Sequence, residues 1–210
     1  MIQLENVTKA YKNNVIFRNL SLEIPTGASV AVTGYNGSGK SVLLKLITGF
    51  SRPDSGTIIV DARQIGKDVD FIQNAGVFIN APQFMNHATG YENLMMLAEI
   101  QKKIGKQEIL DVLERMKLTD AKDKKVRTYS QGMIQRLRIA QAIMESPDIL
   151  IMDEPLNALD KEGIDIAHHI FQEFIENPQK TLLFASHNAE EIRDFASSVI
   201  QVGDATAQYI

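Results

Sequence analysis

Two short stretches of the sequence hold the residue types from which a phosphate-binding site is built. Residues 34 to 41 read GYNGSGKS, which fits the pattern G-x-x-x-x-G-K-[ST]. The glycines let backbone amides turn inward around phosphate oxygens without a Cβ in the way. Lys40 adds a full charge for the β- and γ-phosphates of a nucleotide, and the Ser41 hydroxyl is a ligand for Mg²⁺. The stretch predicts a nucleotide-phosphate site; the alternative is a glycine-rich turn with an exposed lysine.

The second stretch, DILIMDEP at residues 148 to 155, places two acids at the end of an apolar run. A short apolar run without alternation predicts a strand that is buried on both faces. Unpaired carboxylates are costly at such a place unless a cation lies opposite them. We therefore predict that Asp153 holds Mg²⁺ through water and that Glu154 polarises an attacking water as general base. This stretch alone leaves open that the two acids cap the next segment.

The segments around the two stretches predict the elements that position them. ASVAVTG, at residues 28–34, predicts a strand that enters the phosphate loop, and KSVLLKLITGF, at 40–50, predicts a helix that stops near Gly49. The N-terminus of that helix directs its positive end at the same phosphates. Further strands are predicted at residues 2–7, 15–24, 57–61, 148–153 and 181–187, and further helices at 90–103, 106–118, 130–145 and 161–176.

This order of elements predicts an α/β fold with a P-loop NTPase (RecA-like) core. The alternating strands near the N-terminus are expected to form an antiparallel β subdomain. The helical stretch from about residue 84 to 145 is expected to be an insertion into the core. We expect a single domain over residues 1–210, with its core at 1–83 and 146–210.

The composition excludes several classes of protein. The chain has 210 residues, of which 44% are hydrophobic and 23% charged, as in ordinary globular proteins. A net charge of −4 and a pI of about 5.6 give no sign of a nucleic-acid-binding surface. The absence of cysteine excludes disulfides and thiolate metal sites. Because there is no signal pattern and no apolar run near the roughly 20 residues that span a bilayer, we expect a chain that is soluble by itself.

A third stretch, YSQGMIQR at residues 129–136, resembles the signature of the ATP-binding cassette (ABC) ATPases. That signature is Leu-Ser-Gly-Gly-Gln at the start of a helix, followed closely by Gln-Arg. The matching positions are Ser130, Gly132, Gln135 and Arg136, and the departures are Tyr129, Gln131 and Met133. Alone, Ser130 is also explained as a plain helix N-cap. The order of motifs along nearly the whole chain carries the resemblance: GYNGSGKS, signature, ILIMDEP, LNALD and FASH.

The resemblance implies a role for individual residues outside the phosphate loop. Tyr11 stands where the family places an aromatic ring against adenine, although a strand-end tyrosine on the core explains it too. Asp160 resembles the acid that communicates across the family's dimer. His187 resembles the switch histidine that contacts the γ-phosphate; otherwise a histidine after an apolar strand is simply packed or exposed.

The implied assembly is a head-to-tail dimer in which each ATP lies between the phosphate loop of one subunit and the signature helix of the other. ATP then closes the dimer, and hydrolysis removes the charge that holds it shut. The expected catalytic residues are Lys40, Glu154 and His187. The expected nucleotide-binding residues are Tyr11, Gly34, Tyr35, Asn36, Gly37, Ser38, Gly39, Lys40, Ser41, Val42, Ser130, Gln131, Gly132 and Asp160. The expected Mg²⁺ ligands are Ser41, Asn80 and Asp153.

One position departs from the family pattern. A glutamine usually follows the strand that leads into the helical insertion, as Gln-x-Pro. Aligning Pro82 and the run TGYENL places Asn80 at that position. Gln83, three residues later, is then not the counterpart of the family's glutamine. The surrounding stretch looks like exporter ATPases of the bacitracin-resistance type, where this position also departs from glutamine.

The motifs together predict the ATP-binding and ATP-hydrolysing subunit of an ABC transporter, with export as the expected direction. We expect a homodimer or pseudo-dimer that acts with ATP and Mg²⁺ on permease subunits carried by separate chains. Its expected place is the cytoplasm, on the inner face of the cell membrane. One alternative is a soluble ABC ATPase with an assembly role. Another is a degenerate cassette that binds ATP only as a structural switch. The intact Lys40, Asp153, Glu154 and His187 argue against it.

Overall fold

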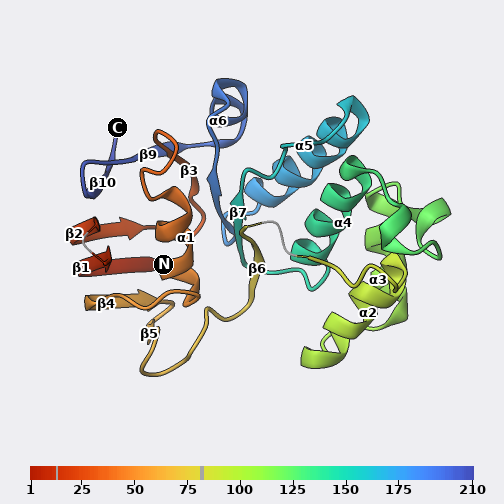
Figure 1. Cartoon of the computed structure of the whole chain (residues 1–210), viewed down its shortest axis with the longest axis horizontal. Coiled ribbons are helices and arrows are strands. Elements are labelled where there is room, and N and C mark those ends of the chain that lie inside the picture. The colour runs from red at the N-terminus through yellow and green to blue at the C-terminus, as the bar shows by residue number, and fades with distance from the viewer. Residues whose placement is uncertain (13, 81–82) are drawn as a thin grey trace.

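The computed structural model of the chain describes residues 1–12, 14–80 and 83–210. Two sheets and the surrounding helices confirm the predicted α/β fold (Figure 1). In this view the antiparallel sheet lies on the left, and the helices of residues 90–175 lie on the right. The predicted proline of the Gln-x-Pro alignment, Pro82, falls outside the described residues.

The antiparallel sheet has the strand order β2-β1-β4-β5. Its strands are β1 (Ile2–Tyr11), β2 (Asn14–Ile24), β4 (Ser55–Val60) and β5 (Arg63–Gln64). Ile2 pairs with Ile24 on one side and with Val60 on the other, and all three side chains are buried. Side chains directly opposite each other share one face of a sheet. The alternation of apolar and polar residues in β1 and β2 therefore produces one face that packs on the core.

The second sheet has the order β10-β9-β3-β8-β7-β6 and is parallel except for its edge strand β10. Its strands are β3 (Ser29–Thr33), β6 (Ala75–Phe78), β7 (Ile149–Asp153), β8 (Thr181–Ala185), β9 (Ser198–Gly203) and β10 (Thr206–Tyr209). β7 lies between β8 and β6, and residues 149–152 are all buried, which explains their unbroken apolar run. The carboxyl ends of the parallel strands meet at one edge, where open α/β sheets bind ligands.

Helix α1 (Lys40–Thr48) follows β3 and packs between the two sheets (Figure 1). Its buried residues Leu43, Leu46 and Ile47 belong to the same apolar cluster as residues of β1, β3 and β7. The helix ends at Gly49, which has a φ of 85°, and a Cβ there would lie 2.4 Å from the carbonyl oxygen of Asp70. The predicted stop near Gly49 is confirmed, because only glycine fits that turn without strain.

The remaining helices lie on the other side of the parallel sheet, where those of residues 131–143, 161–175 and 189–195 pack against it and those of residues 90–101 and 106–115 lie further out (Figure 1). They are α2 (Gly90–Gln101), α3 (Lys106–Arg115), α4 (Gln131–Ile143), α5 (Lys161–Ile175) and α6 (Ala189–Phe195), with short 3₁₀ turns at Thr119–Ala121 and Val126–Thr128. The predicted helices at 90–103 and 106–118 end earlier than expected, because Lys102 and Lys117 adopt a left-handed backbone with φ of 55° and 53°. The exact division between core and helical subdomain, at residues 84 and 145, stays a prediction.

The C-terminal elements α6, β9 and β10 have no clear signal in the sequence. β9 and β10 form a hairpin whose turn residues, Asp204 and Ala205, have φ of 50° and 59°. Such turns usually carry glycine, as in Asn-Gly or Asp-Gly, and glycine is absent from these two positions. The hairpin nevertheless matters for the site, because β9 lies directly behind the phosphate loop.

Candidate active site

The glycines of the predicted phosphate loop are required by close approaches of the backbone. Gly34 has a φ of 146°, and a Cβ there would lie 2.3 Å from the carbonyl oxygen of Val202 in β9. Gly39 has a φ of 113° and is the N-cap of α1; a Cβ there would lie 2.7 Å from Ile16. Gly37 has a φ of 84° and open space around its missing Cβ. The loop thus packs tightly against the protein at Gly34 and Gly39 and faces open space at Gly37, as expected for a loop whose backbone amides surround a phosphate.

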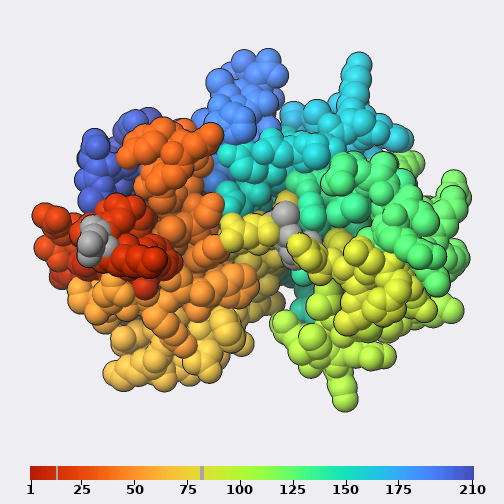
Figure 2. All heavy atoms as spheres, in the orientation of Figure 1, coloured from red at the N-terminus to blue at the C-terminus, as the bar shows by residue number. Residues whose placement is uncertain are grey.

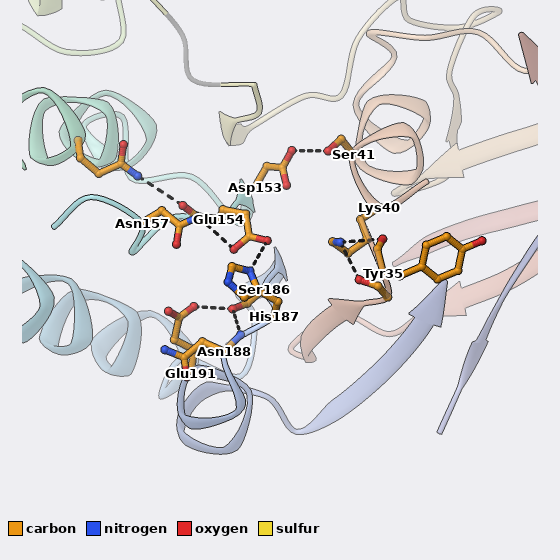
Figure 3. Close-up of polar contacts among 12 residues, drawn as sticks. Tyr35, Lys40, Ser41, Asp153, Glu154, Asn157, Ser186, His187, Asn188 and Glu191 are labelled. Atoms are coloured by element: carbon orange, nitrogen blue, oxygen red, sulfur yellow. Dashed lines mark hydrogen bonds and ion pairs between the residues drawn. The ribbon is translucent and has the colours of Figure 1, made fainter. Parts of the chain in front are cut away.

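Lys40 is held by the loop in a way that suits a phosphate. The residue is 8% exposed, and its ammonium donates to the carbonyl oxygens of Gly34, at 2.8 Å, and Tyr35, at 3.4 Å (Figure 3). Ser38 Oγ is buried and has no hydrogen-bond partner among the described residues. Ser38 lies outside the cavity lining, so the phosphate site of the loop rests on Lys40 and the backbone amides. In Figure 3 the Tyr35 ring points away from Lys40.

Ser41 and Asp153, two of the predicted Mg²⁺ ligands, lie in direct contact. The Ser41 hydroxyl donates to Asp153 Oδ2 at 2.6 Å, although the residues are 112 positions apart (Figure 3). The contact arises because α1 begins and β7 ends at the same edge of the parallel sheet. Among the described residues no group of three or more His, Cys, Asp or Glu could cage a metal. An oxygen pair without a cage fits Mg²⁺, which keeps several waters and binds substrate phosphates.

Glu154, the predicted general base, lies beside His187, the predicted switch histidine. His187 Nδ1 and Glu154 Oε1 are 3.0 Å apart (Figure 3). An ionised carboxylate only accepts hydrogen bonds, so Nδ1 carries the hydrogen in this contact. Asn157 donates to the other oxygen, Oε2, at 3.4 Å. Glu154 leaves the strand with a φ of 52°, and this left-handed turn directs its side chain into the site.

The Glu154–His187 contact changes the proton affinity of the imidazole. Its hydrogen bond to Glu154, reinforced by the negative charge of that carboxylate, raises the pKa of His187 above the ordinary value of 6.5. The ion pair is therefore fully formed below pH 6.5 and is lost as the pH rises through the raised pKa. His187 is 66% exposed, so this pair orients two side chains rather than stabilising the fold appreciably.

Lys40, Ser41, Asp153 and Glu154 line one cavity of about 550 Å³, a usual size for a small-molecule site, whereas the predicted site residues Gly34, Tyr35, Ser38 and His187 lie outside its lining. Its lining residues are Ile16, Asn36, Gly37, Gly39, Lys40, Ser41, Val42, Phe78, Asn80, Gln135, Arg138, Asp153, Glu154, Asn157 and Ala158. Nine of them are predicted site residues: Asn36, Gly37, Gly39, Lys40, Ser41, Val42, Asn80, Asp153 and Glu154. Asn80 is exposed and has a φ of 55°, a conformation that asparagine tolerates well.

Some predicted site residues lie outside the cavity lining. The signature residues Ser130, Gln131 and Gly132 form the start of α4, where Ser130 Oγ accepts from the Met133 amide at 3.2 Å. Asp160 is the N-cap of α5 and accepts from the Gly163 amide at 3.0 Å. Ser130 and Asp160 therefore both act as helix N-caps. The roles of the signature residues and of Asp160 across a dimer stay predictions.

The predicted adenine partner, Tyr11, also lies outside the lining of the cavity. Its hydroxyl lies 3.1 Å from Ser51 Oγ, and the Lys9 ammonium lies 5.0 Å from its ring centroid. The ring is 47% exposed, so it remains free to meet a ligand. Its role with adenine stays a prediction.

The sequence reasoning missed several residues that line the cavity. Asn157 follows Glu154 by three residues, and its place in LNALD was the only available signal. Gln135 lies in the cavity lining and donates to the Pro155 carbonyl oxygen at 2.8 Å, which ties α4 to the end of β7. Ile16 reaches the phosphate loop from β2, and nothing in its local sequence distinguishes it from other strand residues.

The comparison with protein families decides what this site belongs to. The sequence pattern of the family described as "ABC transporter" matches residues 17–157. This chain belongs to the ABC transporter family. The YdbJ protein of Bacillus subtilis (strain 168), an ABC transporter ATP-binding protein, is 36% identical over 99% of this chain and 68% of its own length. The bacitracin transport ATP-binding protein BcrA of Enterococcus faecalis is 32% identical over 95% of this chain and 65% of its own length.

Solved structures agree with the family assignment. The dimeric structure of MJ0796, described as a bacterial ABC transporter cassette, matches with a TM-score of 0.87 and 26% identity, over 99% of this chain and 97% of that one. The predicted P-loop NTPase fold and the predicted ATP-binding, ATP-hydrolysing subunit are thereby confirmed. The alternative of an assembly role outside transport is not favoured. None of the helices within residues 1–12, 14–80 and 83–210 has the length and apolarity to cross a membrane.

Proposed function

We propose that this ABC protein hydrolyses ATP with Mg²⁺ as a closed dimer and thereby drives export of a peptide antibiotic by membrane subunits on other chains. The observation that carries the ATP hydrolysis is the arrangement of the cavity, which is lined by Lys40, the Ser41–Asp153 pair and Glu154 at one edge of the parallel sheet, with His187 in contact with Glu154. The peptide cargo is proposed from the likeness to the bacitracin transport ATP-binding protein BcrA.

Each of these side chains has a distinct task in phosphoryl transfer to water. Lys40 and the loop amides bind the β- and γ-phosphates and stabilise the charge that develops on them. Ser41 and Asp153 are the residues that would hold Mg²⁺. When bound, this ion would neutralise part of the negative charge of the phosphates. Glu154 accepts a proton from the attacking water through Oε1 or Oε2. His187 orients Glu154 through Nδ1, which leaves Nε2 available for the γ-phosphate.

The dimer is proposed because the signature residues cannot act on the cavity of their own subunit from the start of α4. Ser130, Gln131 and Gly132 are outside that cavity, and Ser130 and Gln131 are exposed. A helix N-terminus of this kind suits the γ-phosphate of an ATP bound to a second copy. The dimeric state described for MJ0796 supports the same arrangement.

A methionine-rich groove on α2 is the proposed contact with the membrane subunit. The groove measures about 410 Å³ and is lined by Met85, His87, Ala88, Tyr91, Glu92, Met95, Met96 and Glu99. Met85 and Met96 are 50% and 37% exposed, a high exposure for large apolar side chains. Figure 2 shows this yellow segment at the molecular surface. Flexible methionines suit the docking of an amphipathic partner element.

The proposal is tested by searching the neighbouring reading frames for a multi-spanning membrane protein and co-expressing the chain with it. We expect the two to purify together from membranes and Met96→Glu to disrupt the complex, because a charge enters the groove. Ile100→Glu is the matched control, since Ile100 lies one turn further along α2, is 76% exposed and does not line the groove.

Export is tested separately with membrane vesicles that contain the wild-type complex. These vesicles should transport bacitracin, and the transport should depend on ATP. A complex that is insensitive to Met96→Glu contradicts the docking face, and vesicles that move no peptide contradict the cargo.

Asn80 is expected to limit the rate of ATP hydrolysis. It lines the cavity but is one methylene shorter than the family's glutamine, so its amide reaches Mg²⁺ and the water less directly. Asn80→Gln should raise basal ATPase activity several-fold. It should also lower Tm slightly, since asparagine suits the φ of 55° better.

The control for Asn80 is the exposed Gln83, which does not line the cavity. Gln83→Ala should leave phosphate release nearly unchanged. If Gln83→Ala abolishes hydrolysis while Asn80→Ala has no effect, the alignment through Pro82 is wrong by three positions.

A further inference from the structure

Glu191, on the short helix α6, is a buried carboxylate that the chemistry above does not use. It is only 7% exposed, and this burial raises its pKa. A carboxylate in such a place is destabilising unless it is hydrogen-bonded. Its partner is Ser186, which is fully buried and whose hydroxyl donates to Glu191 Oε2 at 2.7 Å (Figure 3).

Ser186 directly precedes His187 and is held on every side. Its amide donates to the Val32 carbonyl oxygen at 3.2 Å. Its Oγ accepts from the Asn188 amide at 3.0 Å while it donates to Glu191. The residues on both sides of His187 are therefore fixed by one hydroxyl. Because the His187 side chain is itself largely exposed, the backbone of this turn is what aims its ring at Glu154.

The helix that carries Glu191 is itself firmly anchored. Phe195, at the end of α6, is 3% exposed. Its ring packs edge-on against those of His168 and Phe171, with centroid distances of 4.6 Å and 5.5 Å. Glu191 thus reaches the turn from a rigid support, as an orienting residue should.

We propose that Glu191 is a positioning residue for ATP hydrolysis, which accepts the Ser186 hydrogen bond and so holds the turn that aims His187 at Glu154. The inference rests on the proposed roles of Glu154 and His187. The essential property of Glu191 is an acceptor oxygen at this place. A glutamine keeps that oxygen and removes the charge, whereas an alanine removes both.

The charges around Glu191 must be separated from its hydrogen bond. Glu154 raises the pKa of Glu191, while His187 and His168 lower it, so all three interact with its charge. Glu191→Gln therefore changes the electrostatics but keeps the acceptor. Glu190→Ala removes an exposed neighbouring acid and is the matched control.

The test measures kcat and KM for ATP together with the pKa of His187 by NMR. Glu191→Ala and Ser186→Ala should each lower kcat about tenfold or more, because misdirected catalytic groups lose rate steeply. KM should stay unchanged, since the phosphate loop is not touched. The pKa of His187 should fall towards its ordinary value as the ring leaves Glu154. Glu191→Gln should restore kcat and keep the pKa of His187 above that in Glu191→Ala, although it loses the part of the shift that the charge of Glu191 itself causes. The double alanine variant should be no worse than either single one.

Several results would overturn the inference. Wild-type kcat in Glu191→Ala, or a lower kcat with an unchanged pKa of His187, excludes a positioning role. A loss in Glu191→Gln as large as in Glu191→Ala excludes the acceptor role. If Glu191→Ala does not fold, Glu191→Met takes its place, because it removes the acceptor oxygens while it keeps most of the bulk; Ser186→Ala also removes the acceptor of the Asn188 amide and serves only as support. Activity of Glu154→Gln, measured in parallel, separates the claims: an active Glu154→Gln contradicts the proposed chemistry itself.

Discussion

Replacing Glu154 by glutamine is expected to lower ATP turnover by at least about 10²-fold and to leave ATP binding intact. A general base contributes about 10²- to 10⁴-fold to such a reaction, and an amide cannot accept the proton. The shape and the hydrogen-bonding oxygen remain, so the cavity itself should be unchanged. Nucleotide affinity and phosphate release, both measured with Mg²⁺, test the two halves of this expectation.

The matched control for Glu154 is Glu190→Gln, which makes the same chemical change at an exposed position on α6. It should bind and hydrolyse ATP like the wild type. Wild-type turnover in Glu154→Gln would remove Glu154 from the role of general base. A loss of ATP binding in that variant would instead show that the carboxylate is needed to shape the site.

Removing the ammonium of Lys40 is expected to weaken ATP binding by about 10²-fold or more. Lys40 is the only full positive charge in residues 34–41. Hydrogen bonds to charged groups contribute about 1.5–3 kcal/mol each, and Lys40 is placed to reach two phosphates. Within the described part of the chain its ammonium donates to loop carbonyl oxygens, which a phosphate can replace. Equilibrium titration of Lys40→Ala with ATP measures the effect.

Lys45→Ala is the control for Lys40, because Lys45 lies one turn or more along the same helix and outside the cavity. It should keep wild-type affinity. Circular dichroism must show that both variants are folded. An affinity for ATP in folded Lys40→Ala within about threefold of the wild type would contradict the proposed phosphate contact.

Much of the phosphate side of the site could be predicted from sequence because its constraints are local. Gly34 and Gly39 are glycines because a Cβ would strike neighbouring atoms, and the loop joins a strand directly to a helix. The acids of β7 were also predictable, since an unbroken apolar run marks a strand covered on both faces and its end is a defined edge of the sheet.

The contacts on the opposite side of the cavity depend on the tertiary fold and have no local pattern. Glu154 and His187 meet because they follow β7 and β8, which are parallel neighbours in the sheet. Their separation of 33 residues in the sequence does not reveal that these two strands pair. Glu191 looks like an ordinary surface acid in the sequence, and only the packing of α6 buries it. Tyr11 lies outside the cavity lining with its hydroxyl 3.1 Å from Ser51 Oγ, and its role with adenine stays a prediction.

Completion of the ATP site by a second copy can be followed by light scattering of Glu154→Gln. With ATP and Mg²⁺ the mass should rise towards twice the 23.4 kDa of one chain, while ADP should leave a monomer. Adding Gly132→Asp should abolish the rise, because it places a negative charge at the signature helix. The fold has room for that side chain, since a Cβ at Gly132 meets no atom closer than 3.5 Å. An unchanged monomer in saturating ATP at about 100 μM protein, or a dimer that tolerates Gly132→Asp, would contradict the account.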